Sequence, residues 1–183
     1  DTVTNFDMMT NLSKQLREKL DENYYIAFAE PEKKLTSSLD STVKYLFKLR
    51  DGEYIESVLM KYKYGYSICV SSQVGCKMGC KFCASTLNGV VRNLTSSEIL
   101  AQVYTAQRDN NIKISHVVLM GMGEPLDNFD NVMRFISLIT DEKGQDMSMR
   151  HISLSTCGLV PKIYELMNKN LQLTLSVSLH APN

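Results

Sequence analysis

Apolar and polar positions in the second half of the chain follow two alternating periods. Short runs rich in branched apolar residues predict buried strands, and the segments between them repeat apolar residues every three or four positions, as one helix face does. The predicted strands cover residues 67–72, 115–120, 151–155 and 171–178. A capping box from Thr95 to Glu98 begins the first helix, and the second is expected over 127–139. About four strand–helix units with short connections predict a parallel sheet in an α/β fold.

Two other patterns precede these repeats. Leucines recur at helical spacing after Thr10, a candidate N-cap, with charged residues between them, which predicts a small helical appendage. Apolar alternation over 43–49 and 54–60, around an Asp-Gly turn, predicts a β-hairpin. Three units are therefore expected, covering residues 1–40, 41–66 and 67–183.

Charge is balanced over the 183 residues, because 20 basic side chains match 20 acidic ones. Net charge does not indicate an RNA partner, so any basic surface has to be local. One candidate is Lys61-Tyr-Lys-Tyr-Gly-Tyr66, which is typical both of nucleic-acid surfaces and of exposed hairpin turns. No apolar run approaches the roughly 20 residues of a membrane span, and no signal segment is visible. We expect a cytoplasmic monomer without a membrane partner.

Three of the five cysteines follow a C-x3-C-x2-C spacing at Cys76, Cys80 and Cys83. So short a segment predicts that the thiols converge on one side of a loop and hold a metal or cluster. Three ligands leave one coordination position open, whereas a structural zinc site takes four. A zinc knuckle completed by a distant cysteine or histidine is the alternative. The cysteine usage indicates a reducing compartment and no disulfide framework.

Unusual residues follow each predicted strand of the parallel sheet. The cysteine loop follows the first, a Gly-Met-Gly-Glu-Pro segment follows the second, and Ser155 and Ser178 end the third and fourth. Because ligands bind at the carboxyl ends of parallel strands, we expect a single site there. Gly123 can let an amino-acid moiety approach the backbone, and Glu124 can accept a hydrogen bond from its amino group. The alternatives are a helix N-cap role for Glu124, a turn role for Ser155 and a core position for His180.

The cysteine motif, with an aromatic residue before its third cysteine, resembles the signature of radical S-adenosylmethionine (SAM) enzymes. The surrounding sequence segments resemble those of the RlmN-type adenosine C2 methyltransferases of the RlmN/Cfr family, which act on 23S rRNA and tRNA. The matching segments are Cys69-Val-Ser-Ser-Gln-Val-Gly-Cys76, Arg92-Asn-Leu-Thr, Gly121-Met-Gly-Glu-Pro125, Leu154-Ser-Thr-Cys-Gly158 and Ser178-Leu-His-Ala-Pro-Asn183. The resemblance implies a partial (β/α)6 radical SAM barrel, preceded by part of a helical accessory domain.

The resemblance also implies residue roles. The three cysteines would hold a 4Fe-4S cluster, Glu56 would accept the C2 proton, and Cys69 would resolve a covalent RNA–protein adduct. From its strand position alone, Glu56 is better explained as an exposed edge residue. The residues implied to contact SAM are Gly123, Glu124, Ser155, Ser178, Leu179 and His180.

The family mechanism uses a methyl-carrying cysteine near the carboxyl terminus, and this sequence has no counterpart of it. We therefore expect the 183-residue chain by itself to be inactive, although the parent protein would be an enzyme. The last strand is also expected to expose an apolar edge. Two rivals stay open: the C8-methylating Cfr branch, from which Ala84-Ser-Thr-Leu87 differs, and a non-catalytic zinc-bound RNA-binding fragment.

Overall fold

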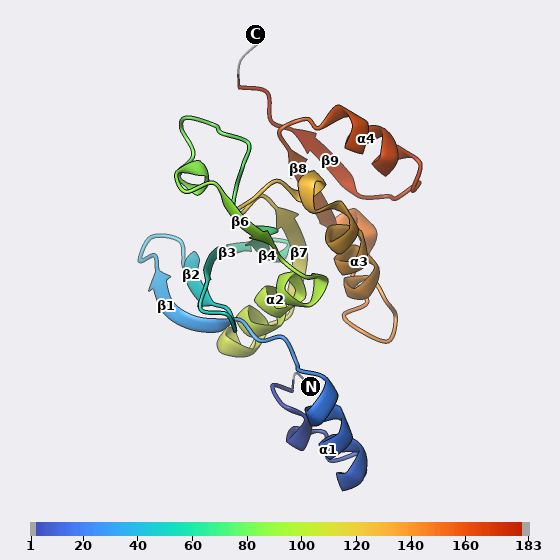
Figure 1. The fold of residues 1–183 in the computed structure, drawn as a ribbon. Helices are drawn as coiled ribbons and strands as arrows, with labels where there is room; N and C mark the ends of the chain where they lie inside the picture. The colour runs from blue at the N-terminus through green and yellow to red at the C-terminus, as the bar shows by residue number, and fades with distance from the viewer. Residues whose placement is uncertain (1–2, 181–183) are drawn as a thin grey trace.

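The computed structural model describes residues 3–180 and contains one large mixed sheet (Figure 1). Its strand order is β1-β2-β3-β4-β7-β8-β9, and a separate pair, β5-β6, stands beside it. Strands β1 to β4 are antiparallel neighbours, whereas β4, β7, β8 and β9 run parallel. The strands are β1 (Glu30–Thr36), β2 (Val43–Lys48), β3 (Tyr54–Tyr62), β4 (Gly65–Val70), β5 (Gln73–Gly75), β6 (Val90–Asn93), β7 (Ile114–Leu119), β8 (Ile152–Thr156) and β9 (Thr174–Val177).

Residues 3–180 contain four helices; the first precedes the sheet, and the other three lie between successive parallel strands, as the sequence predicts. They are α1 (Lys14–Asn23), α2 (Ser96–Asn110), α3 (Phe129–Ile139) and α4 (Val160–Met167), with 3-10 turns η1 (Phe6–Met8), η2 (Ala84–Thr86), η3 (Pro125–Asn128) and η4 (Met149–His151). The capping box is present, since Thr95 caps the Glu98 amide and the Glu98 carboxylate accepts from the Thr95 amide. The predicted β-hairpin is β2–β3. The α/β fold class with about four parallel strands is confirmed, and the parallel part forms an incomplete barrel.

Two local predictions are wrong near the amino terminus. Helix α1 is capped by Ser13, whose hydroxyl accepts from the Leu16 amide at 3.3 Å, and not by Thr10. Residues 30–36, expected within the helical appendage, form the edge strand β1 against β2. Every residue of β1 is exposed, so the strand carries no apolar alternation that a sequence pattern could reveal.

The main core lies between the sheet and the helices α2 and α3. Strands β3 and β4 turn Ile55, Leu59, Ile68 and Val70 toward this side, and all four are buried. Residues between them in sequence, such as Cys69, point to the opposite face because side chains alternate along a strand. The site is built on that opposite face and on the strand ends above it.

Arginine 92 on β6 fixes the beginning of α2 to the hairpin turn. Its guanidinium makes two hydrogen bonds to the Glu98 carboxylate, at 2.9 and 2.8 Å, and a third to Asp51 at 2.6 Å. Burial opposes ionisation of Glu98, but the hydrogen bonds from Arg92 and Thr95 outweigh it and lower the Glu98 pKa. This cluster is a stabilising contact that depends on an ionised carboxylate.

Candidate active site

The segments that follow β4, β7, β8 and β9 meet at one rim of the sheet. Backbone bonds join them in order: the Gly121 amide donates to the Val70 carbonyl at 3.0 Å, and the Ser178 amide donates to the Thr156 carbonyl at 2.9 Å. The Glu124 carboxylate joins the two middle segments by accepting from the Cys157 amide at 2.8 Å. The structure thus brings the predicted site segments together at the carboxyl ends of the parallel strands.

The cysteine loop rises from the β5–β6 pair, which the sequence did not predict because both strands are very short. The Cys76 amide donates to the Gly89 carbonyl at 2.9 Å and closes the base of the loop. At its tip, the Cys83 amide donates to the Cys80 carbonyl at 3.0 Å, and the Thr86 hydroxyl donates to both of these cysteine carbonyls. The loop backbone is therefore fixed by its own hydrogen bonds.

The thiols of this loop lie close enough to influence one another. Burial raises the pKa of Cys76, and the negative charges of Cys83, Glu124 and Cys80 raise it further. Within residues 3–180, however, no three His, Cys, Asp or Glu side chains are grouped as metal ligands. Convergence of the three thiols into one ligand set therefore stays a prediction.

The donor chemistry of the loop nevertheless fits an iron–sulfur cluster. Cys76 is buried, while Cys80 and Cys83 are half-buried and reachable from the rim. Three thiols on one loop, with no fourth on it, match a cluster that keeps one iron open. Phe82, the aromatic residue before the third cysteine, is 70% exposed.

Glu124 is 4% exposed and clamps two strand ends through its carboxylate. One oxygen accepts from the Leu126 amide at 3.0 Å and caps η3, while the other accepts from the Cys157 amide. The helix N-cap role, left open in the sequence analysis, is what the structure shows for one oxygen. Burial, then the hydrogen bond and charge of Glu124, raise the pKa of the Cys157 thiol to about 12, so this thiol stays protonated at neutral pH.

The glycines before Glu124 allow two segments of the chain to pack closely, whereas the sequence analysis expected them to let a ligand approach. A Cβ built on Gly121 would lie 2.7 Å from the Ser71 nitrogen, and one on Gly123 would lie 2.6 Å from the Gln73 Cβ. Gly123 also has a φ of +97°, which disfavours other residues. These positions need glycine because two segments of the chain itself pack there, and that contact accounts for them without a ligand.

The predicted residues on β8, β9 and beyond lie side by side. The hydroxyls of Ser155 and Ser178 are 3.2 Å apart. Leu179 is 79% exposed, and His180 is exposed with its ring 4.7 Å from that of Phe82. The expectation of a core position for His180 is therefore wrong. The contact with Phe82 instead places the end of β9 against the cysteine loop.

Glu56 and Cys69 occupy the face of the sheet opposite α2. Cys69 pairs with Val58 across β3–β4, and Glu56 lies two residues before Val58, so all three share a face. The Glu56 carboxylate is 2.8 Å from the Lys44 ammonium of β2, a contact that the sequence analysis did not anticipate. Burial raises the pKa of Cys69. Ser155 lies on this face too. Cys69 pairs with Val118, Val118 pairs with Ser153, and Ser155 lies two residues after Ser153 on the same strand.

Three buried amides behind the rim were missed from the sequence. Gln102 of α2 binds both the amide and the carbonyl of Ser71, at 2.9 and 3.0 Å. Gln73 accepts from the Glu124 amide at 2.9 Å, and Asn128 donates to the Ser72 and Leu94 carbonyls. The polar composition of the segment before the cysteines is a signal for Gln73 only, because Gln102 and Asn128 lie in other segments.

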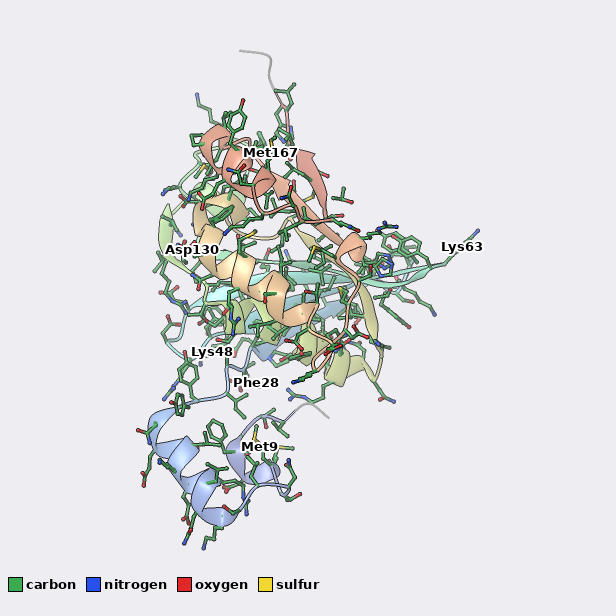
Figure 2. The ribbon with its side chains drawn as sticks, turned by 90° about the vertical axis from the view of Figure 1, so that its right-hand side faces the viewer. Met9, Phe28, Lys48, Lys63, Asp130 and Met167 are labelled. Carbon is green, nitrogen blue, oxygen red and sulfur yellow. The ribbon has the colours of Figure 1, made fainter. Side chains whose placement is uncertain are left out.

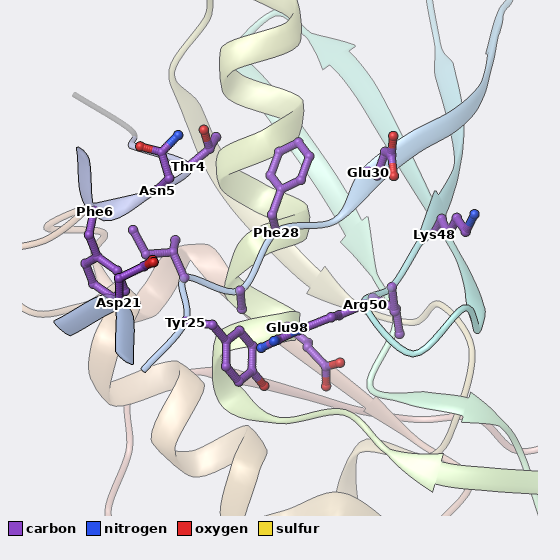
Figure 3. Close-up of a pocket in the computed structure, with 13 residues that line it drawn as sticks. Thr4, Asn5, Phe6, Asp21, Tyr25, Phe28, Glu30, Lys48, Arg50 and Glu98 are labelled. Atoms are coloured by element: carbon purple, nitrogen blue, oxygen red, sulfur yellow. The ribbon is translucent and has the colours of Figure 1, made fainter. Parts of the chain in front are cut away.

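A separate pocket of about 310 Å³ lies between the amino-terminal segment and the main body (Figure 3). Tyr25, Phe28, Arg50 and Glu98 are among its lining residues, and the Arg50 guanidinium sits 4.4 Å from the centre of the Tyr25 ring. None of the predicted site residues lines this pocket. Within the described residues, no helix is both long and apolar enough to span a membrane.

Comparison with known families and structures supports the reading of the motifs. A profile described as the Radical SAM superfamily matches residues 70–183, and one described as the ribosomal RNA large subunit methyltransferase N-terminal domain matches residues 1–26. A crystal structure of a radical SAM methyltransferase from Sphaerobacter thermophilus superposes with a TM-score of 0.91 at 41% identity, covering 99% of this chain and 54% of that one.

Curated relatives extend the match over nearly the whole chain. The probable dual-specificity RNA methyltransferase RlmN of Clostridium novyi is 61% identical over 181 residues, which is 99% of this chain and 53% of the relative. The protein of the same name from Clostridium acetobutylicum is 57% identical over 176 residues, covering 96% and 51%. The chain spans about half the length of the curated relatives it matches.

Proposed function

Because this chain belongs to the radical SAM superfamily, we propose that it is the cluster- and SAM-binding part of an RNA methyltransferase that modifies C2 of adenosine in 23S rRNA and in tRNA. The observation that carries the proposal is the meeting of the cysteine loop with the Glu124 segment and the β8 and β9 ends at one rim. The names of the relatives support the RNA substrate and favour this function over the C8-methylating and zinc-bound alternatives.

Cys76, Cys80 and Cys83 would hold a 4Fe-4S cluster. When bound and reduced, such a cluster supplies the electron that cleaves SAM and keeps an open iron for the SAM amino and carboxylate groups. The loop's own hydrogen bonds hold its base and its tip in place, so binding needs side-chain movement more than backbone refolding. Cys157 remains a neutral thiol beside the site.

The SAM-contacting surface would be formed by the rim segments. Each carboxylate oxygen of Glu124 accepts a hydrogen bond from one backbone amide. Each also keeps a further lone pair that can accept a hydrogen bond from a SAM amino group. The Ser155 and Ser178 hydroxyls offer donors and acceptors beside it. Gly123, Leu179 and His180 complete this proposed surface.

Glu56 and Cys69 would act on the RNA base from the face below the rim. The Glu56 carboxylate is held by its 2.8 Å contact with the Lys44 ammonium, and a carboxylate positioned in this way can accept a proton. Cys69 would act as the thiol that releases the product. Burial keeps it protonated until a base is near, because its pKa is raised.

Cluster binding is tested by anaerobic reconstitution of the chain, followed by iron and sulfide quantitation. We expect Cys80→Ala to lose most of the iron, whereas Cys157→Ala, a matched change of a nearby thiol, keeps it. Equal iron in wild type and Cys80→Ala would defeat the assignment, and zinc without iron or sulfide would favour the zinc-bound alternative.

The methylation itself is tested on a protein that contains this chain and has the full length of the curated relatives. Mass spectrometry of nucleosides from 23S rRNA and tRNA treated with this protein should give 2-methyladenosine. An 8-methyladenosine product would replace the proposed reaction with that of the Cfr branch.

A further inference from the structure

A row of aromatic rings covers the end of the sheet opposite the cysteine loop. The rings of Tyr62 and Tyr64 stack with centroids 5.0 Å apart, and the Tyr64 ring meets His116 edge-on at 4.8 Å. His116 in turn stacks on His151 at 4.3 Å. We call these four side chains the aromatic edge. They come from the β3–β4 hairpin, the beginning of β7 and the turn before β8, which are adjacent through the sheet.

The aromatic edge is open to solvent and is not an extension of the core. Tyr62 is 45% exposed, Tyr64 is 62% exposed, and His151 is also exposed. Burial, followed by the positive charge of His151, lowers the pKa of His116, so that ring is uncharged at neutral pH. Figure 2 shows Lys63 at the tip of the β3–β4 hairpin, projecting away from the body of the sheet.

The segments that carry these rings contain basic and no acidic residues, although the whole chain is neutral. The amino-terminal ends of the four parallel strands and the segments leading into them, residues 60–66, 111–116, 147–152 and 168–173, contain no aspartate or glutamate. Their basic residues are Lys61, Lys63, Lys113, Arg150 and Lys169. None of these five forms an ion pair within residues 3–180, and each lies at least four residues along the chain from a carboxylate side chain.

Exposed rings beside unpaired cations match the two parts of a single-stranded nucleic acid. Bases stack on flat aromatic side chains, and phosphates bind lysine and arginine. A protein partner would have to supply carboxylates and bury the rings, and nothing in the described residues favours that chemistry over RNA. Strand β4 separates this end from the cysteine loop by about 17 Å along the sheet, so one folded RNA can reach both.

We propose that the aromatic edge, with Lys61, Lys63 and Arg150, is a second RNA-binding surface that takes an unpaired segment, apart from the rim where the target base would react. The choice of RNA rests on the proposed function. The surface itself rests on the ring contacts and the local charge.

The test uses the absence of tryptophan from the chain, which makes an introduced tryptophan the only one. Tyr64→Trp places a reporter on the aromatic edge, and Tyr164→Trp places one at a tyrosine of α4 with the same 62% exposure. The full 183-residue chain is titrated with a 12-nucleotide oligoadenylate RNA. We expect quenching of tryptophan emission in Tyr64→Trp and little change in Tyr164→Trp, because only the first ring would stack on a base.

Binding constants come from the anisotropy of the same RNA carrying a fluorescent label. Tyr64→Ala should weaken binding about tenfold, as loss of one stacking ring does, while Tyr64→Phe and Tyr164→Ala should change it less than twofold. Changing Lys61 and Lys63 together to glutamine should lower the slope of log affinity against log salt by about 1.4. The fold of each variant is checked by circular dichroism.

Equal quenching at both reporter positions would overturn the proposal, as would unchanged affinity in Tyr64→Ala. Tighter binding of an RNA duplex of the same length than of the single strand would also overturn it. The assay needs neither SAM nor a cluster. A failure here therefore leaves the methylation proposal standing, and a failed methylation assay leaves this surface standing.

Discussion

Replacing the Glu124 carboxylate by an amide should destabilise the folded chain in the absence of any ligand. The carboxylate accepts from the Leu126 amide at 3.0 Å and from the Cys157 amide at 2.8 Å, while its side chain is nearly inaccessible. In Glu124→Gln the oxygen can keep one of these bonds. The new NH2 group then faces the other amide donor, and neither group has an acceptor.

The expected loss follows from these two contacts. A hydrogen bond to a charged group contributes about 1.5–3 kcal/mol, and a buried donor left without a partner costs about 1–3 kcal/mol. Because the two contributions overlap at one contact, we expect a total of about 2–4 kcal/mol. In a domain of this size, each kcal/mol shifts Tm by about 2–4 °C, so Tm should fall by roughly 5–15 °C.

Differential scanning calorimetry of the chain without cluster or SAM measures this directly. Glu142→Gln is the control, because Glu142 is exposed and makes no hydrogen bond or ion pair within the described residues, and its Tm should stay within about 2 °C of wild type. If the Tm of Glu124→Gln equals that of Glu142→Gln, the carboxylate does not clamp the strand ends. Glu124 would then be a site residue without a structural role.

Three further outcomes are expected. Unfolding free energy should fall below about pH 4.5, because Glu98 has a lowered pKa and its stabilisation is lost as it protonates; Glu98→Gln should flatten this loss in denaturant titrations. Gly75→Ala should melt earlier than Gly79→Ala, since both have positive φ but only the former would meet the Gly89 carbonyl oxygen. Val177→Lys should reduce concentration-dependent light scattering, because Val177 lies 55% exposed on the edge strand β9.

Much of this molecule could be predicted from local patterns. The capping box at Thr95 begins α2 where expected, and the apolar runs gave β4, β7, β8 and β9 to within a few residues. The general rule for parallel sheets predicts that the motif segments lie at one rim. The family resemblance is also confirmed, because the signature cysteines and the Gly-Met-Gly-Glu-Pro segment are contiguous in sequence.

Other features depended on contacts between distant segments. The sequence could not show that Lys44 meets Glu56, since that pair follows from the register of β2 against β3. Nor could it show that Gly123 packs on Gln73.

The sequence by itself determined which segments become strands and helices, because periodicity and end-capping act over a few neighbouring residues. Tertiary structure decided what the buried polar groups do. Glu124 and Gln102 find their partners across strands and helices that are far apart in the chain. A buried polar atom must be hydrogen-bonded, but only the packed arrangement determines which backbone group is within reach.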